Sequence, residues 1–206
     1  MKTLVIDSAT EACSVALFDN DRLLAGDWRM LGRGHAEQLV PMIAALPGQG
    51  QAQRIAVALG PGSFTGVRVG LAAARALAFA WGAELVGYPT LGLIAAMALA
   101  QRHAKGVTVC TTGGHGEWFV QEFDDEATPI TPLASLPPAI AINQATTELF
   151  AGSQSQALVE QRGSGQALEL WPDARAFHLL PPAQITGDTA PLYGRAPDAR
   201  IPGTAV

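Results

Sequence analysis

Charged and aromatic residues are both scarce in this sequence. Only 15% of its 206 residues are charged and 6% are aromatic, and the net charge is −5. The thirteen Lys and Arg residues are scattered along the chain. Proteins that grip nucleic acid need clustered cations to neutralise phosphates. The composition therefore argues against a protein that binds nucleic acid alone, and any such ligand would be held by a partner.

Cysteine is nearly absent, which excludes a disulfide scaffold. Cys13 and Cys110 stand alone in strand-like runs, and we expect both to be small, buried and reduced. Half of the chain is hydrophobic, which is enough for a sizeable core. The sequence thus predicts a globular protein with one large domain or two small ones.

Long hydrophobic runs are also missing. The apolar start meets Asp7 after six residues, which is too short for a signal peptide. The apolar stretch 85–100 is interrupted by Pro89 and Gly92 and is shorter than a membrane span. We therefore expect a cytoplasmic protein without a membrane segment.

The most distinctive stretch is the glycine-rich run GPGSFTGVRVG at residues 60–70. An apolar run at 55–59 precedes it and an alanine-rich run at 71–81 follows, which predicts a strand, a turn and a helix. Such a turn can expose the first N–H groups of the helix to an anion. The candidate phosphate ligands here are Gly60, Gly62, Ser63, Thr65 and Gly66.

This run does not fit the common glycine motifs. A Walker loop needs Lys followed by Ser or Thr, whereas Val67 and Arg68 follow Gly66. The dinucleotide fingerprint needs a shorter spacing than that between Gly62 and Gly66, and no Gly-x-Ser-x-Gly elbow is present. A tight turn that serves packing alone remains open.

The order of the predicted elements suggests two related halves. In the first half, strands at 3–7, 12–18 and 22–28 precede a helix at 34–46, and the strand, turn and helix described above lead to a strand at 84–88 and a helix from Thr90. The second half begins with strands at 106–111 and 117–123 and resembles a degenerate copy of the first half. We predict an N-terminal lobe of residues 1–104 and a smaller C-terminal lobe of residues 105–206.

Together with Ile6-Asp7-Ser8-Ala9-Thr10, the glycine-rich run closely resembles the TsaB (YeaZ) family. These bacterial proteins partner TsaD in making the threonylcarbamoyl modification of adenosine in tRNA. The resemblance covers residues 1 to about 105 and is thinner beyond. It implies an α/β protein with the two-lobed actin-like ATPase (ASKHA, ribonuclease H-like) fold and a degenerate, shortened second lobe.

In an actin-like lobe, the loop after the first strand contacts nucleotide phosphates. The resemblance implies that Asp7 orients a metal-bound water and that the hydroxyls of Ser8 and Thr10 bond phosphate oxygens. The alternative is that Asp7 and Thr10 only cap a hairpin.

A catalytic metal site is not expected. TsaD binds a metal through two histidines at i and i+4 on one helix, whereas His35 is followed by Leu39. The resemblance therefore implies a non-catalytic subunit that activates TsaD, helps recruit TsaE and meets tRNA only through the complex. A weakly bound ATP or ADP with Mg is expected only at the partner interface. A glycoprotease-like (M22-type) metallopeptidase, an actin-like nucleotide-hydrolysing enzyme and a homodimer with a separate role are the alternatives.

Small residues recur every fourth position on the predicted central helix, which lets another helix approach closely. Packing inside the same domain explains this stripe equally well, but the family forms dimers through helices of this lobe. The predicted interface consists of Gly66, Arg68, Gly70, Leu71, Ala74, Arg75 and Ala78.

Two departures from the family affect the second lobe. Thr111-Thr112-Gly113 stands where relatives carry Asp-Ala-Arg, which puts a charge-based role there in doubt. Only a short polar loop lies between Pro182 and Pro191, where relatives place a helix before a closing Pro-x-Tyr-x-Arg motif. We therefore expect one face of the second lobe to need another cover, such as a partner.

Overall fold

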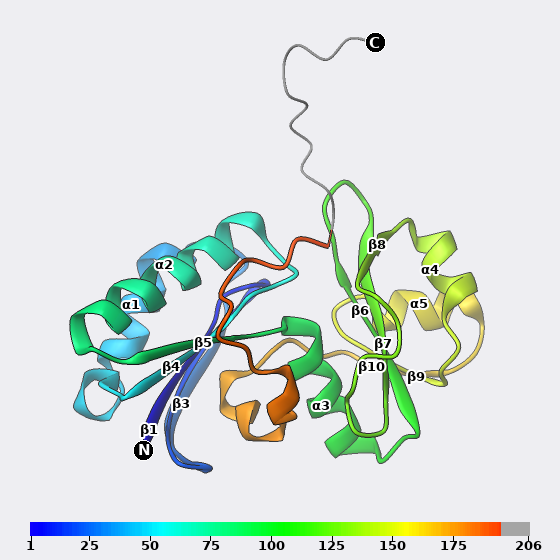
Figure 1. The fold of residues 1–206 in the computed structure, drawn as a ribbon. Coiled ribbons are helices and arrows are strands. Elements are labelled where there is room, and N and C mark those ends of the chain that lie inside the picture. The colour runs from blue at the N-terminus through cyan, green and yellow to red at the C-terminus, as the bar shows by residue number, and fades with distance from the viewer. Residues whose placement is uncertain (195–206) are drawn as a thin grey trace, which may run out of the picture.

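The computed structural model describes residues 1–194 and contains two lobes, each built on a five-stranded sheet (Figure 1). Arg195, which ends the closing motif, lies outside the described residues. The first sheet has the order β3-β2-β1-β4-β5, in which β2 runs antiparallel to β1 and β3 while β1, β4 and β5 are parallel. Its strands are β1 (Lys2–Asp7), β2 (Ala12–Asp19), β3 (Arg22–Met30), β4 (Arg54–Ala58) and β5 (Glu84–Tyr88).

The second sheet repeats this topology with the order β10-β9-β6-β7-β8. Here β7 is antiparallel to β6 and β8, and β6, β9 and β10 are parallel. Its strands are β6 (Gly106–Thr112), β7 (Trp118–Asp124), β8 (Ala134–Leu136), β9 (Leu149–Ala151) and β10 (Gln166–Leu168). The predicted two-lobed actin-like fold with a shortened second lobe is confirmed.

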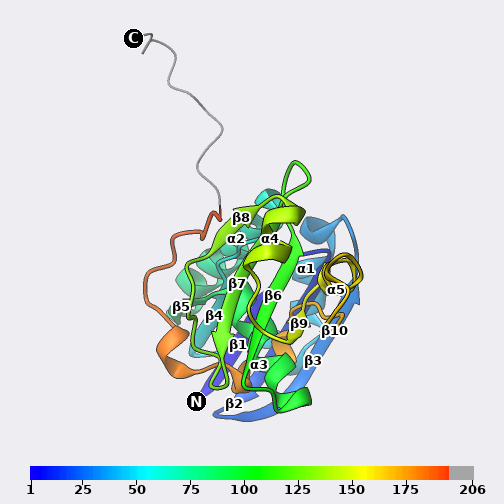
Figure 2. The same ribbon diagram turned by 90° about the vertical axis from the view of Figure 1, so that its right-hand side faces the viewer.

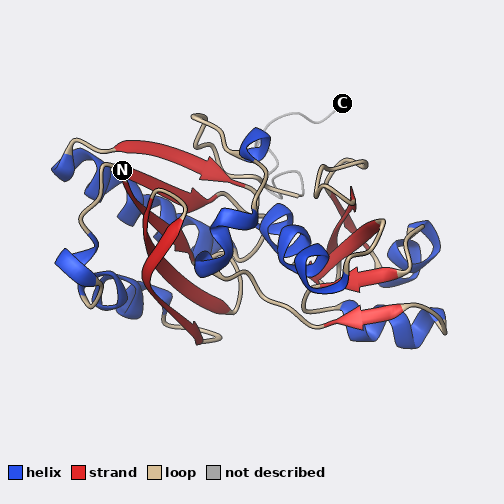
Figure 3. Ribbon diagram, turned by 90° about the horizontal axis from the view of Figure 1, so that it is seen from below, coloured by secondary structure: helices blue, strands red, loops and turns tan. Residues whose placement is uncertain are grey.

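Helices cover both sheets (Figures 1, 2 and 3). In the first lobe, α1 (His35–Ala44) and α2 (Phe64–Trp81) lie on the outer face of the sheet. In the second lobe, α4 (Pro138–Gln144) and α5 (Ser155–Arg162) lie on the outer face of its sheet. A third helix, α3 (Thr90–Arg102), lies between the sheets, and short 3-10 helices occur at Pro47–Gly50 (η1), Ala174–Leu179 (η2) and Pro182–Gln184 (η3). None of the helices in residues 1–194 is long and apolar enough to cross a membrane.

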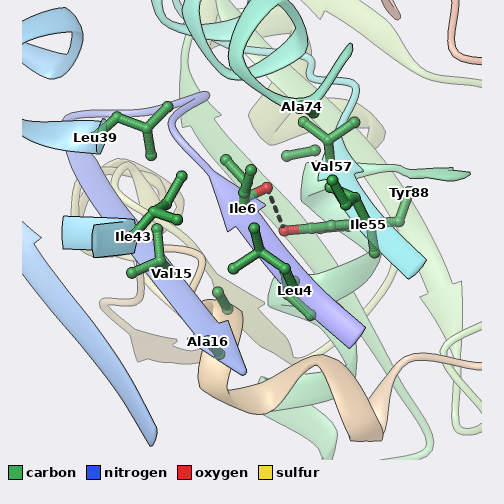
Figure 4. Close-up of a cluster of buried hydrophobic side chains, with 14 of the residues drawn as sticks. Leu4, Ile6, Val15, Ala16, Leu39, Ile43, Ile55, Val57, Ala74 and Tyr88 are labelled. Atoms are coloured by element: carbon green, nitrogen blue, oxygen red, sulfur yellow. Dashed lines mark hydrogen bonds between the residues drawn. The ribbon is translucent and has the colours of Figure 1, made fainter. Parts of the chain in front are cut away.

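The core of the first lobe explains why its central strands are almost wholly apolar. Leu4 and Ile6 of β1 and Ile55 and Val57 of β4 are all but inaccessible to solvent, because helices cover one face of the sheet and η2 and α3 the other (Figure 4). Tyr88 adds an aromatic ring whose hydroxyl donates to the Ile6 carbonyl oxygen at 3.2 Å. Burying each such aliphatic side chain contributes about 1.5–3 kcal/mol.

Helix α3 is apolar all round because both of its sides are covered. Leu91 and Ile94 pack with Val107 and Phe119 on the inner face of the second sheet, whereas Leu93 joins the core of the first lobe. For this face the other cover that we expected is therefore not a partner but a part of the same chain. The helix that ends the first lobe supplies the cover.

After β10 the chain returns to the first lobe. Ser14 Oγ accepts from the Ala174 N–H at 2.9 Å, and Thr186 and Gly87 exchange two backbone hydrogen bonds of 2.8 and 3.0 Å. The Leu192 N–H donates to the Leu59 carbonyl oxygen at 2.8 Å. Residues 186–194, here called the C-terminal strap, thus belong in space to the first lobe, although the predicted C-terminal lobe of residues 105–206 included them.

Candidate functional site

A cleft of about 540 Å³ opens between the two lobes. The first lobe contributes residues 9–11 after β1 and residues 62–64, 67 and 68 of the glycine-rich turn and α2. The second lobe contributes residues 111–115 from the end of β6 and the loop after it, together with Phe119 and Ser135, and the C-terminal strap closes one side with residues 192–194. This volume is in the range of small-molecule sites.

The glycine-rich turn does not hold space open for an anion beside the first strand. Ser63 N–H donates to the Ala9 carbonyl oxygen at 2.7 Å. A Cβ on Gly62 would collide with that same carbonyl, and a Cβ on Gly66 would collide with the Ser8 carbonyl. These glycines therefore allow two backbones to touch, and the open alternative of a packing turn describes them correctly.

Helix α2 begins inside the glycine-rich run, earlier than the composition of residues 71–81 indicated. Ser63 caps it, because its Oγ accepts from the Gly66 N–H at 3.2 Å. Thr65, another predicted phosphate ligand, is exposed in the first turn of α2. The N–H of Gly66 is thereby used inside the chain and is not offered to a ligand.

Asp7 is fully buried and does not line the cleft. Its Oδ1 accepts from the Ala9 N–H at 3.0 Å and its Oδ2 from the Tyr88 hydroxyl at 3.2 Å. Burial raises the pKa of this carboxyl to about 7, against the two hydrogen bonds that lower it. The hypothesis that Asp7 orients a metal-bound water is wrong, because no solvent reaches it.

The other predicted phosphate ligands are divided. Ser8 is buried and its Oγ donates to the Gly66 carbonyl oxygen at 2.9 Å, so the hydroxyl is already used. Thr10 lines the cleft, yet its Oγ1 accepts from the Ala12 N–H at 3.3 Å, as the hairpin-cap alternative requires. Of the predicted set, only Thr10, Gly62 and Ser63 face the cleft, and Gly60 instead lies against the Leu192 carbonyl of the strap.

The stripe of small residues on α2 faces its own sheet. Gly66, Gly70, Ala74 and Ala78 are buried, as is Leu71. A Cβ on Gly70 would lie 2.6 Å from Ser8 Oγ, so the glycine lets α2 sit close to β1. The prediction that this stripe forms an interface is wrong for these five residues, whereas Arg68 and Arg75 are exposed.

The exposed side of α2 carries a different apolar surface. Phe79 is 93% exposed, and Ala72 and Ala76 lie near it on the same side of the helix. On the adjacent α1, Val40 is 59% exposed. We call this surface the outer helical face and define it as Ala36, Val40 and Ala44 of α1 with Ala72, Ala76 and Phe79 of α2. The sequence reasoning missed it, although Ala72, Ala76 and Phe79 recur at helical spacing.

A stacked group stands at the mouth of the cleft. The Arg68 guanidinium carbon lies 3.2 Å from the centroid of the Phe64 ring and 5.4 Å from that of Tyr193. The two rings stack with their centroids 6.2 Å apart. Arg75 binds the strap directly, because its Nη2 donates to the Thr189 carbonyl oxygen at 2.9 Å. The strap thus positions Arg68 through Tyr193, which the sequence alone did not indicate.

No group of three His, Cys, Asp or Glu side chains in residues 1–194 is placed to hold a metal ion. His35 is buried at the start of α1, and Leu39, four residues later, is part of the core. The two free cysteines are buried, and burial raises the pKa of the Cys13 thiol to about 12.

Comparison with known proteins connects this architecture to a family. The family model described as "TsaD: tRNA N6-adenosine threonylcarbamoyltransferase" matches residues 29–135, just over half of the chain. The "tRNA threonylcarbamoyladenosine biosynthesis protein TsaB" of Escherichia coli strain K12 is 35% identical over 128 residues, which are 60% of this chain and 55% of the relative. The chain belongs to the TsaB (YeaZ) family.

Other TsaB-family proteins agree in sequence and in fold. The TsaB protein of Haemophilus influenzae is 40% identical over 98 residues, which cover 45% of this chain and 40% of the relative. The chain spans about half the length of the curated relatives it matches. Two solved structures from Pseudomonas aeruginosa share the fold. The structure described as "YeaZ" has a TM-score of 0.75 and 25% sequence identity, and the match covers 93% of this chain and 99% of that chain. The structure of a protein "with similarity to peptidase YEAZ" has a TM-score of 0.77 and 24% sequence identity, and the match covers 94% of this chain and 99% of that chain.

Proposed function

We propose that this TsaB-family chain is a non-catalytic subunit of the machinery that makes threonylcarbamoyladenosine in tRNA. In this role it binds and activates TsaD, and it helps recruit TsaE. The observation that carries the proposal is the outer helical face, because Phe79 projects almost fully into solvent beside the exposed alanines Ala72 and Ala76 of α2. Family membership supports the pathway, since the curated relatives are named for it.

The outer helical face has the composition of a helix-docking surface. Alanines on adjacent helices let a partner helix approach closely, and Phe79 supplies a large apolar side chain that can fill a pocket. Arg68 and Arg75 lie at its margin and can meet carboxylates of a partner. The proposed contact therefore lies about half a turn around α2 from the buried stripe of small residues, and it keeps the two arginines of the predicted interface.

The assignment of the chemistry to TsaD is supported by residues of this chain. Leu39 stands where a second metal-binding histidine would follow His35, and Asp7 is sealed beneath Tyr88. The net charge of −5 favours contact with tRNA through the complex rather than through this chain alone. A weakly bound ATP or ADP with Mg at the partner contact stays a prediction.

Copurification with TsaD tests the proposal. Phe79→Arg and Ala76→Arg place charge on the outer helical face without touching the core, so we expect both to abolish copurification. The matched control is Ile140→Arg, at a residue 44% exposed on α4 in the other lobe, and it should copurify like the unmodified chain.

Two measurements accompany this experiment. Circular dichroism and thermal melting must show that every variant is folded, and sedimentation of the chain alone reports whether the same face forms a homodimer. Retention of TsaD by both folded α2 variants would overturn the proposed contact. Steady ATP hydrolysis or peptide cleavage by the purified chain would overturn the non-catalytic role.

A further inference from the structure

The cleft between the lobes carries a cationic group and an unused hydroxyl on opposite lobes. We propose that it binds a small organic monocarboxylate with an apolar body, whose carboxylate is held by Arg68 and whose polar contact to the second lobe is Thr111. The cleft lining shares no residue with the defined outer helical face, although Arg68 also lies at the margin of that face, so the inference does not depend on the proposed function. The bound molecule would bridge the two lobes.

Arg68 is prepared for a planar anion. Its guanidinium carbon lies over the Phe64 ring, 3.2 Å from the ring centroid, and Tyr193 flanks it at 5.4 Å. Among residues 1–194 it has no hydrogen-bond or ion-pair partner, so its N–H groups are free for a ligand. A guanidinium held by stacking loses little freedom when it binds a carboxylate with two parallel hydrogen bonds.

Thr111 is the independent sign of a ligand on the other wall. It belongs to β6, lines the cleft and is only 3% exposed. Its Oγ1 has no hydrogen-bond partner in the described part of the chain. A buried hydroxyl without a partner costs about 1–3 kcal/mol, which a ligand oxygen or N–H group would recover.

The charges of the lining select against polyphosphates. Among the described residues that line the cleft, Glu11 and Arg68 are the only Asp, Glu, Lys or Arg side chains, so their formal charges cancel. A nucleotide triphosphate brings several negative charges and would face Glu11 with Arg68 as the one cation that this described lining offers. The Ala9 carbonyl also occupies the turn where a phosphate would need N–H donors.

The rest of the lining suits an apolar body. Phe64, Phe119, Leu192 and Tyr193 provide aromatic and aliphatic surface, and about 540 Å³ accommodates a ligand of modest size. One carboxylate attached to such a body matches both Arg68 and the apolar walls.

Ligand-observed NMR on the full chain tests the site with a panel of small monocarboxylates and their uncharged amides, including 3-phenylpropanoate with 3-phenylpropanamide, and with ATP. We expect members of the carboxylate set to bind and their amides to bind at least about tenfold more weakly. Amide chemical shifts of the 15N-labelled chain should move at residues 62–68 and 111–114. ATP should not compete.

Variants decide whether the named residues are responsible. Arg68→Met should weaken carboxylate binding by about tenfold or more, and the isosteric Thr111→Val should weaken it by a few-fold. Arg75→Met is the matched control, because Arg75 lies two turns away on the same helix and binds the strap instead. It should bind the probes like the unmodified chain.

Three results would overturn the proposal. One is that no carboxylate of the panel binds at millimolar concentration, and another is that folded Arg68→Met binds them unchanged. The third is that ATP binds in the cleft more tightly than the carboxylates.

Discussion

The two lobes share a strand order but differ in how they are held together. In the first lobe an 18-residue α2 and strands of five to nine residues enclose a large apolar core. In the second lobe β8, β9 and β10 have three residues each, and the outer helices have seven and eight. The second lobe compensates for its shorter elements by packing against α3 and by a buried polar network. The same strand order can therefore be kept with shorter strands and helices when a helix of the other lobe covers the sheet.

One detail recurs at the equivalent position of each lobe. After β4, Gly62 lies against the Ala9 carbonyl beyond the end of β1, and after β9, Gly152 lies against the Cys110 carbonyl on β6. Gly152 also has a φ of 109°, which side chains rarely adopt. In both lobes the glycine that precedes the second outer helix therefore serves backbone contact.

The largest effect is expected from adding a methyl group at these contacts. Gly62→Ala should lower the free energy of unfolding by about 3 kcal/mol or more, because its Cβ would overlap backbone rather than a flexible side chain. Urea denaturation measures the change. Gly152→Ala should act similarly if the two lobes depend equally on this contact.

Gly114→Ala is the matched control for this comparison. Gly114 lines the same cleft, but a Cβ there would meet nothing within 4 Å and its φ is not positive. We expect a change within about 0.5 kcal/mol. A loss at Gly114 as large as that at Gly62 would contradict the role of backbone contact.

The second effect concerns the polar network of the second lobe. Buried Glu122 accepts from the Thr146 N–H at 2.6 Å, from Thr146 Oγ1 at 2.8 Å and from Thr108 Oγ1 at 3.2 Å. Glu122→Ala would leave the two Thr146 donors without their partner, whereas Thr108 Oγ1 would keep Thr147 Oγ1 at 2.8 Å, and it should cost about 2–3 kcal/mol in urea denaturation. A neutral result would mean that α3 alone stabilises this lobe.

The third effect concerns the buried carboxyl of Asp7 in the first lobe, which should make the stability of the protein depend on pH. The folded pKa of Asp7 is about 7, whereas its ordinary value is 3.8, so between these values the folded chain keeps a proton that the unfolded chain has lost. Stability is therefore complete below the ordinary pKa and falls as pH rises through this window. We expect a loss of about 2 kcal/mol between pH 5 and pH 7.

Asp7→Asn removes this titration and keeps most of the shape of the side chain. Its free energy of unfolding, measured over the same pH range, should lack the decline attributed to Asp7. An unchanged decline in the variant would assign the pH dependence to other groups.

The smallest effect is expected on the outer helical face. Phe79→Arg should change the free energy of unfolding by less than about 0.5 kcal/mol, because the ring is already in solvent. Thermal melting together with urea denaturation measures this. A large destabilisation would mean that Phe79 contributes to the fold and that its surface is not free for a partner.

Much of the fold could be predicted from local patterns. Alternating and continuous apolar runs located the first three strands, β4 and β5, and the glycine-rich run marked the start of α2. The short strands β8, β9 and β10 could not be found, because three residues carry no measurable periodicity. Their pairing depends on β6 and β7, which are distant from β10 in the chain.

The candidate site was less predictable than the fold. Arg68 and Thr10 were named from the sequence, and both line the cleft. Phe64, Tyr193 and Thr111 could not be grouped, since they come from different lobes and from the strap. The i, i+4 pattern on α2 correctly marked a close contact, but a pattern of small residues does not tell which neighbour makes it.

The sequence by itself determined which segments become strands and helices, because hydrophobic periodicity and glycine positions act within a few residues. Only the tertiary structure decided which face of α2 is buried, that Asp7 lies beneath Tyr88, and that α3 covers the second sheet. Those outcomes depend on contacts between residues far apart in the chain. Burial and hydrogen bonding there follow from the packing of whole elements, which no single stretch encodes.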